Sequence, residues 1–109
     1  MRVTHNKLIR DRIPEIIQAD GHRAVTRVLD GVPYRSALVA KLVEEAQEAQ
    51  TASLDDLPGE LADIFEILQA LLPTLSMAWP DLVALATDKR NQWGGFTQRL
   101  FLEYVEGAD

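Results

Sequence analysis

The chain has 109 residues, 47% apolar and 26% charged, a balance typical of one ordinary globular domain rather than a disordered chain. It has no cysteine, which excludes disulfides and thiolate metal sites, and its two separate histidines, His5 and His22, do not suggest an imidazole-built zinc site. The net charge of −6 argues against binding a nucleic-acid polymer through a broad basic face.

Charge is unevenly distributed along the chain. Residues 1–40 carry seven Arg or Lys against four Asp or Glu, whereas residues 41–109 carry four against thirteen. The acidic part is compatible with a small anionic ligand if a metal ion mediates, because the cation reverses the local field.

Hydropathy predicts a cytoplasmic protein with no membrane partner. No apolar run approaches the roughly 18 to 20 residues that span a bilayer. The first residues, MRVTHNKLIRDR, also lack the apolar segment of a signal peptide.

Proline and glycine divide the first half of the chain into predicted elements. A short helix over Asp11 to Ala19 has Pro14 in its first turn and stops at Gly21. Residues 22–29 are rich in branched side chains and favour an extended segment, although they alternate poorly. Pro33 then opens a long helix that continues to about Thr51.

The second half continues in the same way. After the turn SLDDLPG, a second long helix runs from about Pro58 to Leu72 and is stopped by Pro73. Pro80 opens a last helix that ends near Trp93, before Gly94-Gly95. The tail FTQRLFLEYVE is either a short strand paired with residues 22–29 or an irregular cap. We therefore expect an all-α domain over residues 1–109, a bundle of about four helices with minor short strands.

Both long helices carry carboxylates beside their apolar arcs. At roughly 100° per residue, Glu45 lies at the edge of the first arc and Glu48 about 60° further round. Glu60 lies within the second arc and Asp63 just past it, whereas Glu66 falls on the opposite face and should be solvated. The arcs themselves comprise Leu38, Val39, Leu42, Val43, Ala46 and Ala49 in the first helix, and Leu61, Ile64, Phe65, Ile67, Leu68, Leu71 and Leu72 in the second.

The short turn makes the two helices antiparallel neighbours, so Glu45 and Glu48 should face Glu60 and Asp63 across their seam. Carboxylates there repel one another and lose hydration, each at a cost of several kcal/mol. A divalent cation compensates this cost, and oxygen ligands favour Mg²⁺, with Mn²⁺ or Ca²⁺ as substitutes. Because Mg²⁺ readily binds substrate phosphates, the pattern indicates phosphoryl chemistry.

Other interpretations of these acids remain open. An EExxE string is often a solvated helix face, and Glu60 is also a first-turn acid favoured by the helix dipole. A di-iron bundle is poorly supported, because it needs Glu-x-x-His and neither histidine has a Glu three residues before it.

The acidic pair EExxE…ExxD (Glu44, Glu45, Glu48, then Glu60 and Asp63) resembles the all-α nucleoside triphosphate pyrophosphohydrolases. This MazG-like superfamily includes dimeric dUTPases and phosphoribosyl-ATP pyrophosphohydrolase. NKLIRDRIPEII, residues 6–17, and the late KR…GGF (Lys89, Arg90, Gly94, Gly95, Phe96) are similar to its small phosphoribosyl-ATP pyrophosphohydrolase-like branch. The likeness spans nearly the whole chain.

The resemblance implies cleavage between the α and β phosphates of a nucleoside triphosphate, giving monophosphate and pyrophosphate, as in the removal of non-canonical nucleotides. Glu45, Glu48, Glu60 and Asp63 would hold one or two Mg²⁺ ions, with Mn²⁺ as a substitute. The catalytic glutamates would be Glu44, Glu45 and Glu48, one of them orienting or deprotonating the attacking water. A homo-oligomer, dimer or tetramer, is also expected at the level of the family.

The resemblance also suggests ligands for the triphosphate: Lys7, Arg10, Lys89 and Arg90. The alternative is that these cations are solvated, and that Arg10 or Arg12 pairs on the surface with Asp11 or Glu15. Trp93 departs from the family pattern, which has a basic residue before Gly-Gly, and would either stack on a base or join the core, as we expect of Trp79.

Two other functions stay open on this sequence. One is a helical oligomerisation or regulatory module whose acidic seam binds metal only for structure. The other is hydrolysis of phosphoribosyl-ATP in histidine synthesis, which has the same chemistry on a different substrate.

Overall fold

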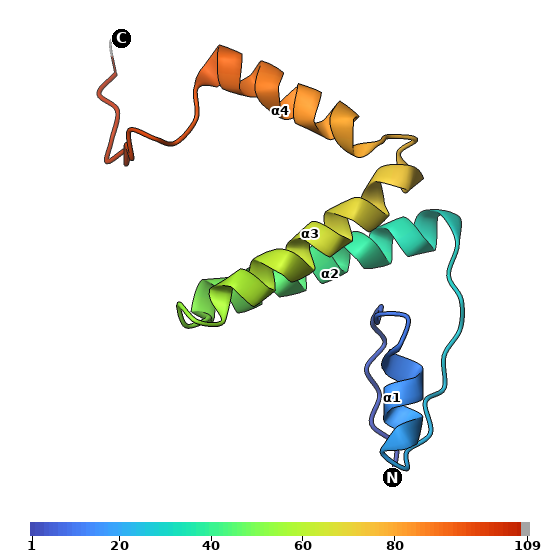
Figure 1. The fold of residues 1–109 in the computed structure, drawn as a ribbon. Coiled ribbons are helices and arrows are strands. Elements are labelled where there is room, and N and C mark those ends of the chain that lie inside the picture. Colours follow the sequence, from blue (N-terminus) through green and yellow to red (C-terminus); the bar gives the residue numbers. More distant parts are fainter. Residues whose placement is uncertain (108–109) are drawn as a thin grey trace. The chain divides into compact units, whose positions relative to one another are not determined.

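The computed structural model describes residues 1–107, and these residues are helical wherever they are regular. The helices are α1 (Ile13–Ala19), α2 (Gly31–Thr51), α3 (Leu57–Thr74) and α4 (Trp79–Trp93), shown in Figure 1. The predicted all-α class with four helices is therefore confirmed for this part of the chain.

The minor short strands are not found: residues 1–107 contain no strand, and both residues 22–29 and the tail after Gly95 are irregular apart from a turn. For the tail, this is the second of the two alternatives that the sequence left open. Poor alternation explains this for residues 22–29, and the tail carries apolar side chains on successive residues. An extended segment without a buried face and a paired neighbour cannot keep its ladder of hydrogen bonds.

The helix ends follow local chemistry. Gly21, with φ +85°, follows the end of α1, and Gly94, with φ +83°, follows α4 and donates its N–H to the Arg90 carbonyl at 2.8 Å. The prediction that Pro73 stops α3 is wrong, because the helix continues through it to Thr74. A proline one residue before the helix end costs α3 little stability, because the hydrogen bond that its absent N–H cannot form is one of the last in the helix.

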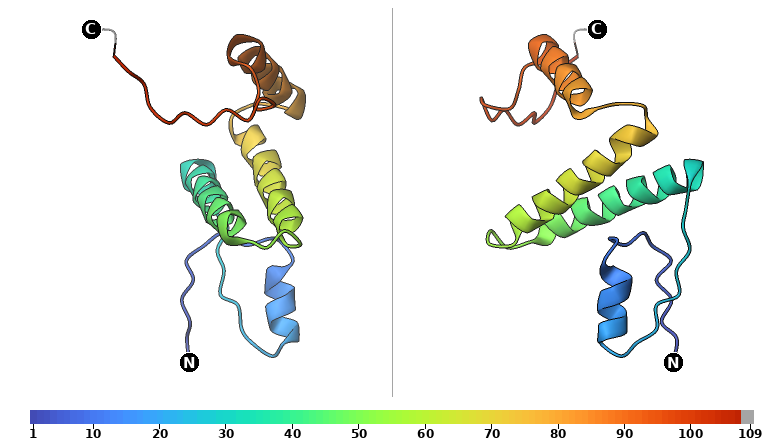
Figure 2. Two further views of the ribbon diagram at one scale, coloured as in Figure 1. Left: turned by 90° about the vertical axis from the view of Figure 1, so that its left-hand side faces the viewer. Right: turned by 45° about the vertical axis from the view of Figure 1, so that its right-hand side comes forward.

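The chain divides into two compact units, Met1–Met77 with α1 to α3, and a second unit that starts at Ala78 and contains α4. In the first unit α2 and α3 pack side by side and antiparallel, as the short connection predicts (Figures 1 and 2). At one end of this pair, Arg35 Nε donates to Thr74 Oγ1 at 3.2 Å, which ties the start of α2 to the end of α3. The prediction of one domain over the full length stays a prediction.

The core of the first unit is narrow. Leu38, Ile67 and Leu72 are buried, and half-buried residues flank them. Five members of the predicted apolar arcs are instead exposed: Val39, Val43, Ala46, Leu61 and Phe65. Two packed helices cover only one strip of each other's surface, so the outer edges of both arcs stay open within the chain.

In the described residues, no helix taken singly has the length and apolar character to cross a membrane. Only α3 and α4 together, joined across a bent break, meet that test by length and composition.

Candidate metal centre

The helical repeat brings Glu45 and Glu60 into the seam between α2 and α3. Glu45 follows Leu38 by seven residues and Glu60 precedes Ile67 by seven, close to two turns in each case, so each carboxylate shares a face with a core residue. Glu45 is consequently buried, with only 7% of its surface exposed, and Glu60 is half-buried. Glu66 is exposed, as predicted for the opposite face.

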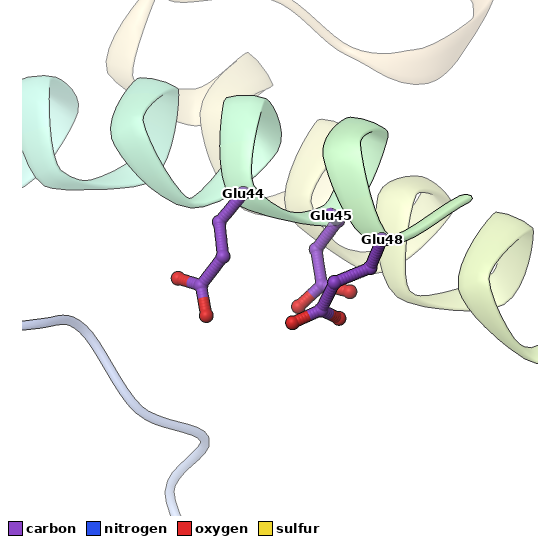
Figure 3. A group of neighbouring side chains, drawn as sticks. All are labelled: Glu44, Glu45 and Glu48. Atoms are coloured by element: carbon purple, nitrogen blue, oxygen red, sulfur yellow. The ribbon is translucent and has the colours of Figure 1, made fainter. Parts of the chain in front are cut away.

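The predicted acids gather into two overlapping groups. Glu44, Glu45 and Glu48 each offer an oxygen that lies within 4.8 Å of the others, and Glu45, Glu60 and Asp63 form a second group by the same measure. Figure 3 shows the three α2 side chains extending from the same side of the helix. Glu45 belongs to both groups and therefore stands at the centre of the cluster, whereas Glu48 is exposed at its margin.

Two oxygens in the cluster lack a partner. Within the described residues, Glu45 Oε2 and Glu60 Oε2 are buried and form no hydrogen bond. A buried acceptor left without a donor costs about 1–3 kcal/mol, and more when it is charged. Hard cations bind carboxylate oxygens of this kind, so these residues fit the Mg²⁺ that the sequence pattern implies.

The pKa of Glu45 is also shifted by its buried, acidic surroundings. Burial raises this pKa from 4.5 to about 7, and the neighbouring carboxyls of Glu60, Glu48 and Asp63 add to the effect. The largest cause is burial, which disfavours the ionised carboxyl. A divalent cation acts in the opposite direction because it favours the charged form.

Two of the four predicted phosphate ligands lie against the acids. Arg10 Nη2 donates to Asp63 Oδ1 at 2.7 Å, and Lys7 Nζ donates to Glu44 Oε1 at 3.4 Å. Both cations come from the segment before α1, which therefore neutralises part of the cluster. The other two predicted ligands, Lys89 and Arg90, lie on α4 in the second unit.

The surface pairing considered for Arg12 is confirmed, because its Nε lies 2.8 Å from Glu15 Oε1 with both side chains exposed. Among the described residues, Arg10 pairs with Asp63 rather than with Asp11 or Glu15. The two arginines, two residues apart, thus have different environments.

The sequence reasoning missed Lys41. This mostly buried side chain places Nζ 3.9 Å from Glu44 Oε2 and 3.9 Å from Glu45 Oε1. The signal was present, because Lys41 stands three and four residues before these glutamates, the spacing of neighbours on a helix. Lys41 adds a fixed positive charge at the edge of the cluster.

Comparisons with known proteins give one partial likeness. The chain is 48% identical over 50 residues to an uncharacterised protein of Mycolicibacterium smegmatis, an overlap of 46% of this chain and 51% of that protein. The chain thus matches about half the length of this relative. No family model matches the chain, and no solved structure matches it either. The site itself must therefore carry the functional proposal.

Proposed function

We propose that the chain is a Mg²⁺-dependent nucleoside triphosphate pyrophosphohydrolase of the MazG-like all-α type. The observation that carries the proposal is Glu45, a buried carboxyl with an unpartnered oxygen at the point where two acidic groups overlap. A buried polar group without a partner calls for a physical explanation, and a bound cation is one that fits a carboxylate. The EExxE…ExxD spacing supports the same activity through its resemblance to these enzymes.

Glu45, Glu48, Glu60 and Asp63 would hold the ion, with Glu44 accessory. Bound Mg²⁺ supplies charge neutralisation for the phosphates and orientation of substrate and water. The reaction adds water oxygen to phosphorus and breaks the bridge between the α and β phosphates. Pyrophosphate leaves with the bonding electrons, and one of the glutamates accepts the proton from water.

The exposed margin of the cluster suits a glutamate with that role. Glu48 reaches solvent while one of its oxygens stays within 4.8 Å of the Glu44 and Glu45 ligand atoms. Water can therefore reach this carboxylate, whereas Glu45 is closed off in the seam. We assign Glu48 as the first residue to test for activation of water.

Lys7 and Arg10 have a role that changes with occupancy. In the described structure their charges balance Glu44 and Asp63. With a metal ion bound, Arg10 would share Asp63 with the ion, and Lys7 would be repelled by the ion beside Glu44, so both ion pairs would weaken. The two cations would then be available to triphosphate oxygens, Arg10 in bidentate fashion and Lys7 as a point charge.

A pyrophosphate-release assay tests the proposal over canonical, damaged and phosphoribosylated nucleotides with Mg²⁺ present. The wild type should release pyrophosphate from at least one substrate, whereas Glu48→Gln and Asp63→Asn should not. Glu66→Gln is the matched control, because Glu66 lies on α3 but is exposed on the other face. Equal turnover in all variants would defeat the assignment.

A second candidate function is a helical oligomerisation or regulatory module in which the metal serves only structure. The exposed apolar side chains of α2 and α3, among them Val39, Val43, Leu61 and Phe65, favour it, since a second copy of the chain would cover such a face. A structural ion should raise the melting temperature with no turnover over the whole nucleotide panel. A dimer or tetramer with turnover is compatible with the first proposal.

A further inference from the structure

The second unit carries an open hollow at the end of α4 that the acidic cluster does not explain. Its lining includes Lys89, Arg90, Trp93, Gly94, Gly95 and Phe96. Lys89 and Arg90 precede Trp93 by four and three residues, so the two cations and the indole occupy neighbouring positions on one helix face. The turn at Gly94 then brings Phe96 to the same hollow.

Both aromatic rings are open to solvent. Trp93 is 76% exposed and Phe96 is 95% exposed, as are other large apolar side chains of this unit such as Phe101. What sets these two rings apart is that they line the hollow beside Lys89 and Arg90. Placing Arg90 in the last turn of α4 is explained by the helix dipole alone. The dipole does not explain why two large rings stand uncovered beside two cations.

The two glycines leave room beside these rings. A Cβ added at Gly94 or Gly95 would meet no atom within 4 Å, so the space next to this backbone is open. A ligand can therefore approach the backbone of this loop without meeting side chains there.

We propose that this hollow binds a phosphorylated aromatic ligand, a nucleotide, with its base stacked on Trp93 and Phe96 and its phosphates on Lys89 and Arg90. Stacking tolerates any base because every base has a flat π face, whereas the cations select for phosphate. The inference rests on the proposed function for its ligand class and deepens it, because it assigns recognition of the base to the second unit.

Tryptophan fluorescence of the full-length chain tests this inference without hydrolysis. The chain has two tryptophans, so Trp79→Phe leaves Trp93 as the single reporter. In EDTA, ATP should change the Trp93 emission saturably, and inorganic tripolyphosphate should not. Trp93→Phe, which retains only Trp79, is the control for the decrease in emission that arises because the nucleotide itself absorbs light.

Affinity for ATP, measured in EDTA by calorimetry, gives the second readout. Trp93→Ala should weaken it about 5- to 150-fold, the equivalent of about 1–3 kcal/mol of base stacking. Phe101→Ala removes another exposed ring of the same unit that does not line the hollow, and it should have no effect. Because Trp93 is largely exposed, its replacement should leave the fold intact, which circular dichroism checks.

Three results would overturn the inference: no response of Trp93 to ATP, an equal response to tripolyphosphate, or an emission that follows protein concentration but not ATP. The last would mark the rings as part of a contact between copies. Failure of pyrophosphate release alongside a normal Trp93 response would refute the proposed hydrolysis and leave the nucleotide site standing.

Discussion

Each unit holds side chains in an environment that is unfavourable for them: an acid away from water in the first unit, and aromatic rings in water in the second. In the first unit, the acid Glu45 is buried between helices α2 and α3. In the second, the rings of Trp93 and Phe96 face water beside Lys89 and Arg90. Each arrangement is costly in the free chain, one through desolvated charge and the other through uncovered apolar surface.

Under the two proposals, the two units take different ligands. A cation in the first unit would remove the cost there by pairing with the buried oxygens. A flat, phosphorylated molecule in the second would cover the rings and pair with the cations. The proposals therefore assign Mg²⁺ to the first unit and the nucleotide base to the second.

The largest expected effect separates the two units by a single substitution. Glu60→Gln keeps the shape of the side chain but removes a charge from the seam, so it should reduce pyrophosphate release more than about 100-fold, beyond the loss typical of an outer-shell change at a metal site. The response of Trp93 to ATP in EDTA should stay at the wild-type level. The assay of pyrophosphate release and the fluorescence titration are run on the same preparation.

Loss of both pyrophosphate release and the Trp93 response in Glu60→Gln would contradict the assignment of separate ligands to the two units. Retention of full turnover would instead exclude Glu60 from the metal centre. A melting curve of the variant distinguishes either result from unfolding.

The pH dependence of stability sharpens the account of the first unit. The folded pKa of Glu45, about 7, is higher than its ordinary 4.5, so the folded state holds this proton more tightly. The stability contributed by Glu45 is complete below pH 4.5 and is lost as the pH rises through about 7. One pKa unit corresponds to about 1.36 kcal/mol, so this group should cost the metal-free protein at most about 3 to 4 kcal/mol of unfolding free energy over that range. Denaturant titration in EDTA at a series of pH values measures the loss.

Glu45→Gln is the matched variant, since its amide has no proton to lose in this range. Its metal-free stability should stay level between pH 4.5 and about 7, where the wild type declines. Mg²⁺ should stabilise the wild type above pH 7 and have little effect on the variant. A wild-type curve as level as that of Glu45→Gln would show that the carboxyl ionises freely in the seam.

Much of the fold followed from spacing in the sequence. Proline and glycine marked the four helices, and the short SLDDLPG turn fixed α2 and α3 as antiparallel neighbours. Periodicity erred where it assumed that a whole apolar arc is buried: Val43 and Leu61 are exposed because one partner helix covers only part of each arc. The sequence of one helix does not show how much of its apolar arc the partner helix will cover.

The candidate site was predictable to a similar extent. Helical spacing brought the five acids together, but it could not foresee that Glu45 would be buried more deeply than Glu60, since depth depends on the crossing of the helices. The contact from Arg10 to Asp63 joins residues 53 positions apart, which no local pattern reveals. Lys41 was visible in the sequence, because its spacing to Glu44 and Glu45 is that of ordinary helix neighbours.

The smallest expected effect concerns the ion pair between Arg10 and Asp63. Both side chains are substantially exposed, so Arg10→Ala should change the unfolding free energy by less than about 1 kcal/mol. The variant should nevertheless bind Mn²⁺ several-fold more tightly in the absence of nucleotide, because Asp63 no longer has a competing cation. Titration of Mn²⁺ by electron paramagnetic resonance measures this affinity directly.

Arg12→Ala supplies the control, because Arg12 carries the same charge two residues away but pairs with Glu15 at 2.8 Å, outside the acidic cluster. Long-range attraction alone would make both substitutions raise Mn²⁺ affinity by the same factor, and the increase would shrink as salt is added. Direct competition for Asp63 predicts an effect of Arg10→Ala that exceeds that of Arg12→Ala and survives in salt. Equal effects would therefore reduce the segment before α1 to a diffuse source of positive charge.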